Sequence, residues 1–162
     1  MDQATLEKLW EMGPVFTEQT PHAKKLGIKF VSVDKGRSTI SLPYNANLIG
    51  DPDSRVIHGG AVTTLLDQAS GLAAIAGFDK PRMVATLNLS IDYMRPATPG
   101  ETLLAQAHCY KVTRHIAFVR CIAHDGDPDD PVATSQATFM VTVPQSRAKK
   151  ASHKAKEAHD GS

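Results

Sequence analysis

The sequence predicts an α+β protein in which one long apolar helix lies against a curved antiparallel sheet. Three observations support this prediction. Residues 60–77 are apolar on nearly every side, as expected of a buried helix. Residues 83–93 alternate between apolar and polar side chains, which is typical of a half-buried strand. The segments after residue 93 are joined by short connections, which favour antiparallel neighbours.

The elements before the long helix are shorter. Residues 4–11 predict a short helix with Leu6, Leu9 and Trp10 on one side, and Pro14 and Pro21 punctuate the chain after it. Two strands are expected at 27–33 and 38–43, because a turn at 34–36 separates two strand-like runs. A loop over 44–56 then leads into the apolar helix.

The strand at 83–93 has two distinct faces in the sequence. One is expected to carry Leu87, Leu89, Ile91 and Tyr93, and the other Thr86, Asn88, Ser90 and Asp92. Further strands are expected at 102–112, 116–124 and 132–142, which gives one sheet of five to six strands. Because the helix is apolar all round, we expect the sheet to wrap around it and a second subunit to cover the rest.

The domain organisation is simple. A helical lead-in over 1–24 precedes one domain over 25–143, and a polar tail over 144–162, rich in Lys, Ala, Ser and His, is expected to be disordered. The formal net charge of +1 gives no reason to expect nucleic acid or a membrane surface as a partner, and no apolar run reaches the roughly 20 residues of a membrane helix.

The cysteines and histidines do not indicate a metal site. Cys109 and Cys121 are isolated, and the seven histidines form no cluster with metal-ligand spacing. We therefore expect a cytoplasmic protein without disulfides, metal or cofactor.

Asp67 is the one residue that does not fit a buried helix. It lies near the middle of the apolar segment, which contains no Lys or Arg. Burying an unpaired carboxylate costs several kcal/mol, so such a group is usually paired, exposed or functional. Two explanations are open: the carboxylate is functional, or it is hydrogen-bonded by a neighbour three or four positions away, namely Thr63, Thr64 or Ser70.

Three motifs in order resemble the hot-dog-fold thioesterases, in particular the phenylacetate-pathway branch of acyl-CoA thioesterases. They are His58-Gly59-Gly60 with Asp67 nine residues after His58, the strand ending in Tyr93-Met94-Arg95-Pro96, and the run 114–120. The resemblance spans residues 25–143. It implies a hot-dog fold, hydrolysis of aromatic or short- to medium-chain acyl-CoA, and a homodimer, possibly a dimer of dimers.

The helix start has the chemistry that such a reaction needs. The first N–H groups of a helix have no partner within the helix, and the positive end of the helix dipole lies behind them. Gly59 has no side chain to block close approach, so its amide is the candidate that polarises the thioester carbonyl. Asp67 is the candidate general base or nucleophile. Alternatively, the two glycines serve only to pack the helix tightly on the sheet.

The spacing of these two residues predicts a shared site. Eight residues along one helix separate Gly59 from Asp67, which corresponds to about 12 Å. One chain is therefore not expected to bring both to the same thioester. Two antiparallel helices related by a two-fold axis would supply Gly59 from one subunit and Asp67 from the other. The family resemblance implies the same arrangement.

The resemblance and the residue types suggest further site residues. Thr86 would orient water, His58 would line the site, and Asn47 would lie near the thioester, although the loop after Asn47 is longer than in relatives. Gly60 and Ser70 are expected near the substrate, and Arg95 and Arg114 are candidates for the coenzyme phosphates. Each also has a structural explanation: strand propensity for Thr86, helix-entry packing for His58, and a solvated surface charge for either arginine.

Two other functions remain open from the sequence. One is a non-catalytic protein that binds acyl-CoA or a small ligand. The other is an acyl-thioester dehydratase or hydratase, which is less expected because no histidine lies within the helix.

Overall fold

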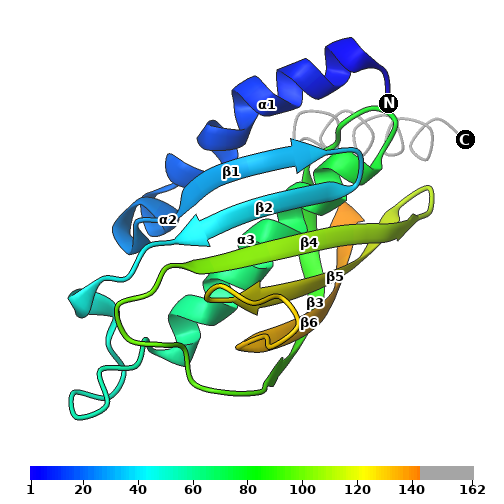
Figure 1. Cartoon of the computed structure of the whole chain (residues 1–162). Coiled ribbons are helices and arrows are strands. Elements are labelled where there is room, and N and C mark those ends of the chain that lie inside the picture. Colours follow the sequence, from blue (N-terminus) through cyan, green and yellow to red (C-terminus); the bar gives the residue numbers. More distant parts are fainter. Residues whose placement is uncertain (143–162) are drawn as a thin grey trace, which may run out of the picture.

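The computed structural model describes residues 1–142, so the expected tail at 144–162 lies outside the described residues. Six strands form one antiparallel sheet in the order β1-β2-β4-β5-β6-β3 (Figure 1). Their bounds are β1 Lys29–Asp34, β2 Arg37–Leu42, β3 Val84–Tyr93, β4 Leu103–Val112, β5 Ile116–His124 and β6 Ala133–Val141. This confirms the predicted order of elements and the α+β class.

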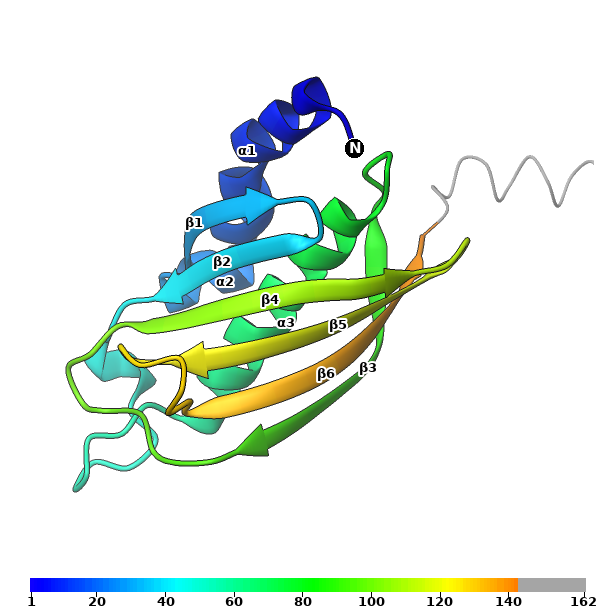
Figure 2. The same ribbon diagram turned by 45° about the vertical axis from the view of Figure 1, so that its right-hand side comes forward.

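The long helix α3, Gly59–Gly77, lies across the concave face of the sheet (Figure 2). Its small and branched apolar side chains pack against β2, β4 and β5, and Leu65 and Leu66 have no exposed surface. Burying a leucine side chain stabilises the fold by about 2 kcal/mol. The Ser38 hydroxyl of β2 donates to the Ala69 carbonyl at 2.7 Å, which ties the middle of the helix to the sheet.

The N-terminal helix α1, Gln3–Glu18, is longer than predicted. It continues through Pro14, where the sequence predicts an interruption because proline lacks an N–H and its ring clashes with the preceding turn. Packing outweighs this cost. Gly13 lies so close to Phe30 of β1 that a Cβ would overlap the ring, and Trp10 meets the same ring edge-on at 5.3 Å. A short helix α2, Pro21–Leu26, follows, with Pro21 in its first turn.

The packing of α1 also changes how α3 is covered. Leu9 is buried, and α1 contacts both β1 and α3 (Figure 2). Part of the helix surface that we expected a second subunit to cover is therefore covered by α1.

Strand β3 contains a bulge that corrects its predicted faces. Thr86 pairs with Phe139 and Asn88 with Thr138, so Leu87 is an extra residue in β3. One extra residue reverses the alternation. Thr86 therefore points toward α3, and Leu87, predicted on the apolar inner face, is 54% exposed. Further along the strand, Leu89 and Ile91 pack against the core as predicted.

Candidate active site

The start of α3 leaves one backbone donor open. The His58 Nδ1 accepts from the Gly60 N–H at 2.9 Å, and the His58 carbonyl accepts from the Ala61 N–H at 2.9 Å. Within residues 1–142, the Gly59 N–H has no such acceptor. Of the first three N–H groups of the helix, Gly59 alone is thus left to bind a ligand at the positive end of the dipole.

His58 serves as the N-cap of α3 and is itself held in place. Its N–H donates to the Leu48 carbonyl at 2.8 Å, and Gly50 packs so closely that a Cβ there would lie 2.8 Å from the His58 Cα. Because Nδ1 accepts a hydrogen bond, the neutral ring carries its proton on Nε2. Asn47 belongs to the adjacent turn, Ala46–Leu48, and is exposed beside this helix start.

Tyr93 at the end of β3 is a site residue that the sequence reasoning missed. Its hydroxyl donates to the Gly59 carbonyl at 2.9 Å and lies 2.7 Å from the Thr63 hydroxyl. The phenol therefore fixes the peptide unit between Gly59 and Gly60 from the sheet side. The sequence placed Tyr93 on the apolar face of its strand, and alternation alone cannot show that its hydroxyl reaches the helix.

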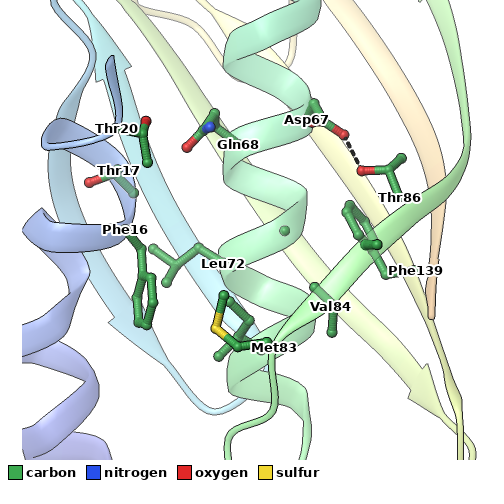
Figure 3. Close-up of a pocket in the computed structure, with 13 residues that line it drawn as sticks. Phe16, Thr17, Thr20, Asp67, Gln68, Leu72, Met83, Val84, Thr86 and Phe139 are labelled. Atoms are coloured by element: carbon green, nitrogen blue, oxygen red, sulfur yellow. Dashed lines mark hydrogen bonds between the residues drawn. The ribbon is translucent and has the colours of Figure 1, made fainter. Parts of the chain in front are cut away.

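Asp67 is half-buried and is paired with the sheet. The Thr86 hydroxyl donates to Asp67 Oδ1 at 2.9 Å (Figure 3). The alternative partners on the helix do not bind it: the Thr63 and Thr64 hydroxyls donate to the carbonyls of Gly59 and Gly60. One oxygen of the carboxylate is thus fixed by Thr86, and Oδ2 is left for a further ligand.

A cavity of about 230 Å³ opens beside this pair. Asp67 and Thr86 line one side, and Phe16, Gln68 and Leu72 line the other (Figure 3). Gln68 was not predicted, because a glutamine next to the acidic residue gives no distinct signal in the sequence. Its amide supplies both a donor and an acceptor to the cavity.

A second cavity, of about 400 Å³, lies at the start of α3. It is lined by Gly59, Tyr93 and Arg95, and no residue lines both this cavity and the one at Asp67. Gly59 and Asp67 of one chain therefore face separate spaces, about 12 Å apart along the helix.

The sequence predicts that Gly60, Ser70 and Arg114 lie near the substrate, but none of the three lines either cavity. Ser70 is fully buried, its hydroxyl has no partner within residues 1–142, and it lines neither cavity. Arg114 is exposed in the β4–β5 turn, near the C-terminal end of α3. Gly60 carries no side chain, and its N–H is already used by His58.

Arg95 is held within its own chain. It forms ion pairs with Asp125 and Asp130, and its Nη1 donates to Asp125 Oδ2 at 3.0 Å. The hydrogen bond from Arg95 holds the pKa of Asp125 well below its usual range, and the carboxylate in turn raises the pKa of Arg95. The guanidinium thus holds the wall of the cavity at Gly59 in place, and its donors are already used by the two aspartates.

Two further properties concern the described part of the chain. Residues 1–142 contain no group of three or more His, Cys, Asp or Glu arranged to hold a metal ion. None of the helices in this range combines the length and the apolar character needed to cross a bilayer.

Comparison with known proteins agrees with this architecture. The family model of the thioesterase superfamily matches residues 55–132. The acyl-coenzyme A thioesterase PaaI of Escherichia coli is 31% identical over 107 residues, covering 62% of this chain and 68% of PaaI. The medium/long-chain acyl-CoA thioesterase YigI of Salmonella typhimurium is 24% identical over 143 residues, covering 80% of this chain and 91% of YigI.

A solved structure from Pseudomonas aeruginosa superposes with a TM-score of 0.75 at 36% identity, covering 83% of this chain and 99% of that one. The chain belongs to the thioesterase superfamily, so the predicted hot-dog fold and the class of thioester hydrolase are confirmed.

Proposed function

We propose that this protein hydrolyses acyl-CoA thioesters to a free acid and CoA, at a site shared by two subunits. The observation that carries the proposal is the combination of an open Gly59 N–H at the start of α3 with the Asp67–Thr86 pair on the same helix. The names of PaaI and YigI support acyl-CoA as the substrate class.

Each residue has a defined role in the proposed reaction. The Gly59 N–H donates to the thioester oxygen and stabilises the negative charge that develops there. Asp67 takes a proton from a water molecule while the water oxygen bonds to the carbonyl carbon. The C–S bond then breaks, and the proton passes to the CoA thiolate. Alternatively, the Asp67 carboxylate attacks the carbon itself, and water hydrolyses the resulting anhydride.

The residues around this pair would act as positioning residues. Thr86 fixes one oxygen of Asp67 and so leaves Oδ2 to face the water or the carbonyl carbon. The His58 carbonyl, which shares a peptide unit with the Gly59 N–H, accepts from the Ala61 N–H and so orients that N–H. The His58 ring caps the helix, and Tyr93 holds the next peptide unit through the Gly59 carbonyl. Asn47 and the Nε2–H of His58 lie at the exposed rim of the helix start, where we propose that they contact the substrate.

The edge strand β3 supports the two-subunit site. Among the described residues β3 pairs only with β6, so its other edge is free, and the strand carries exposed apolar or aromatic side chains, Leu87 at 54% and Tyr93 at 52%. A free edge of this kind is a template for pairing with another chain. We propose that β3 pairs antiparallel with its copy in a homodimer.

The same pairing would assemble the site. On β3, Thr86 contacts Asp67 and Tyr93 contacts Gly59. A two-fold axis between these two positions places Tyr93 of one subunit opposite the partner subunit's Thr86. Gly59 of one chain then lies near the partner's Asp67, and each dimer contains two equivalent sites.

The coenzyme phosphates require cations outside the Asp67 cavity. Arg95 is already bonded to two aspartates, so Arg114, which is exposed, is the better candidate of the two predicted arginines. A dimer of dimers and a cytoplasmic location also remain proposals from the sequence.

The proposed chemistry is tested by Asp67→Asn, which keeps the shape of the side chain and removes the base. We expect kcat for acyl-CoA hydrolysis, measured by release of free thiol, to fall by roughly 10²–10⁴-fold. Asp129→Asn, the same change on an exposed turn, serves as the control and should leave kcat unchanged. Tight binding of acyl-CoA by the wild type without thiol release would instead favour the non-catalytic binding protein.

A further inference from the structure

The N-terminal helix α1 forms a wall of the cavity that contains Asp67. Phe16 of α1 projects into this cavity, opposite Leu72 of α3 and near Met83, which precedes β3 (Figure 3). The family model begins only at residue 55, so α1 lies outside the matched segment. The α1 wall of the Asp67 cavity therefore lies outside residues 55–132, which the family model matches.

A further cavity, of about 330 Å³, continues along α1 away from Asp67. It shares three lining residues with the Asp67 cavity, namely Phe16, Ile75 and Met83. The two cavities are therefore neighbours, with these three side chains at their common boundary. We call the two cavities together, which lie between α1 and α3 and begin at the Asp67–Thr86 pair, the groove.

We propose that this groove holds the acyl chain of the substrate and that α1 sets the chain length the enzyme accepts. The inference rests on the proposed function, because it takes the thioester carbon to lie at Asp67. It assigns a linear aliphatic acyl group of medium length as the preferred substrate class.

The chemistry of the lining favours an acyl chain over the other long part of the substrate, the pantetheine arm of CoA. The walls of the further cavity are mostly apolar, with Thr5, Lys8 and Arg82 as the polar exceptions. Methylene groups need no polar partners and gain free energy when they leave water. The amides of a pantetheine arm would lose their water without enough donors and acceptors to replace it.

The dimensions of the groove set the expected chain length. Eight residues of α3 separate Asp67 from Ile75, a distance of about 12 Å. With C–C bonds of about 1.5 Å in a zigzag chain, this length accommodates roughly ten carbon atoms. The Asp67 cavity alone, at about 230 Å³, exceeds the roughly 150 Å³ that holds a benzene ring, so an aromatic acyl group would leave the further cavity unused.

Met12→Trp tests the proposal, because Met12 lines the further cavity and not the Asp67 cavity. It is 42% exposed, so a larger side chain can fill the groove without entering the core. Val15→Trp is the matched control: Val15 lies on the same helix, is 40% exposed, and lines neither cavity. The full chain is assayed with butyryl-, octanoyl- and dodecanoyl-CoA by release of free thiol.

We expect Met12→Trp to lower kcat/KM for dodecanoyl-CoA by tenfold or more, because each methylene that is no longer buried lowers kcat/KM by roughly fourfold. The value for butyryl-CoA should stay within about twofold of the wild type. Val15→Trp should preserve the wild-type profile. An equal loss for all three substrates would show that the groove holds the coenzyme arm, and an unchanged profile would show that the acyl chain lies elsewhere; either result overturns the proposal.

Binding separates this inference from the proposed reaction. The dissociation constants of the three thioesters are measured by calorimetry for Asp67→Asn with and without Met12→Trp. If affinity rises with chain length, and Met12→Trp abolishes this rise, the groove is supported. Absence of thiol release by the wild type would refute the proposed hydrolysis and would leave this conclusion about the groove unchanged. Affinity independent of chain length overturns the groove.

Discussion

The Gly59 N–H is the smallest feature on which the proposed chemistry depends, and it can be removed selectively. Gly59 is the first residue of α3, where proline is favoured and its missing N–H breaks no helical bond. His58 has φ −59° and ψ 134°, the extended conformation that a following proline requires. A Cβ at Gly59 would meet Tyr93 at 3.5 Å, an ordinary contact.

We therefore predict that Gly59→Pro folds with a melting temperature close to that of the wild type and loses about 10²–10³-fold in kcat, the usual effect of removing one oxyanion donor. Gly59→Ala retains the N–H and should keep most of the activity. Equal activity of the alanine and proline variants in the thiol-release assay would exclude the amide as the oxyanion donor.

At the scale of single residues, the sequence predicted Gly59 and Asp67, because glycines at a helix start and an acid within an apolar helix are unusual. It placed Thr86 on the wrong face of β3, since alternation does not show where a bulge adds one residue. Tyr93 and Gln68 were missed, because their roles depend on which cavity or carbonyl the folded chain brings near them.

Among the elements, the connections after β3 and β5 are joined by a partly buried ionic contact. Arg95 follows β3, and Asp125, whose side chain is 6% exposed, follows β5 and also accepts from the Thr98 N–H at 2.7 Å. Because the folded state lowers the pKa of Asp125, the contact stabilises the fold above the ordinary carboxyl pKa of about 3.9 and is lost as the pH falls below it.

We predict that Asp125→Asn lowers the free energy of unfolding at pH 7 by about 2 kcal/mol, as expected for a hydrogen bond to a charged group. In urea titrations the difference from the wild type should shrink as the pH falls from about 4 toward 2, because the unfolded carboxyl takes up a proton over this range while the native carboxyl, with its lowered pKa, stays ionised. Asp129→Asn, on the same turn but exposed, controls for loss of charge. A difference that stays constant with pH would show that Asp125 acts through shape and not through its charge.

The elements themselves were predicted well, and the exception is informative. All six strands and α3 were expected from the sequence: β3 from its alternation, α3 from its continuous apolar character, and the other strands from strand-like runs separated by turns. The helix α1 was expected to end near residue 11, since Pro14 opposes a helix locally. Its continuation depends on the contact between Gly13 and Phe30, which are 17 residues apart, and on the packing of α1 against α3.

For the whole molecule, the central claim is that two chains make each site. A single chain separates Gly59 from Asp67 into two cavities, whereas pairing of the β3 edges would bring the two together. The most direct test is to co-express Gly59→Pro with Asp67→Asn under two affinity tags and to purify the mixed dimer. Each variant alone lacks one half of both sites. In the mixed dimer one of the two sites has both halves intact, so we predict about half of the wild-type kcat per dimer. A mixed dimer as inactive as its two parents would show that Gly59 and Asp67 do not act together across the interface.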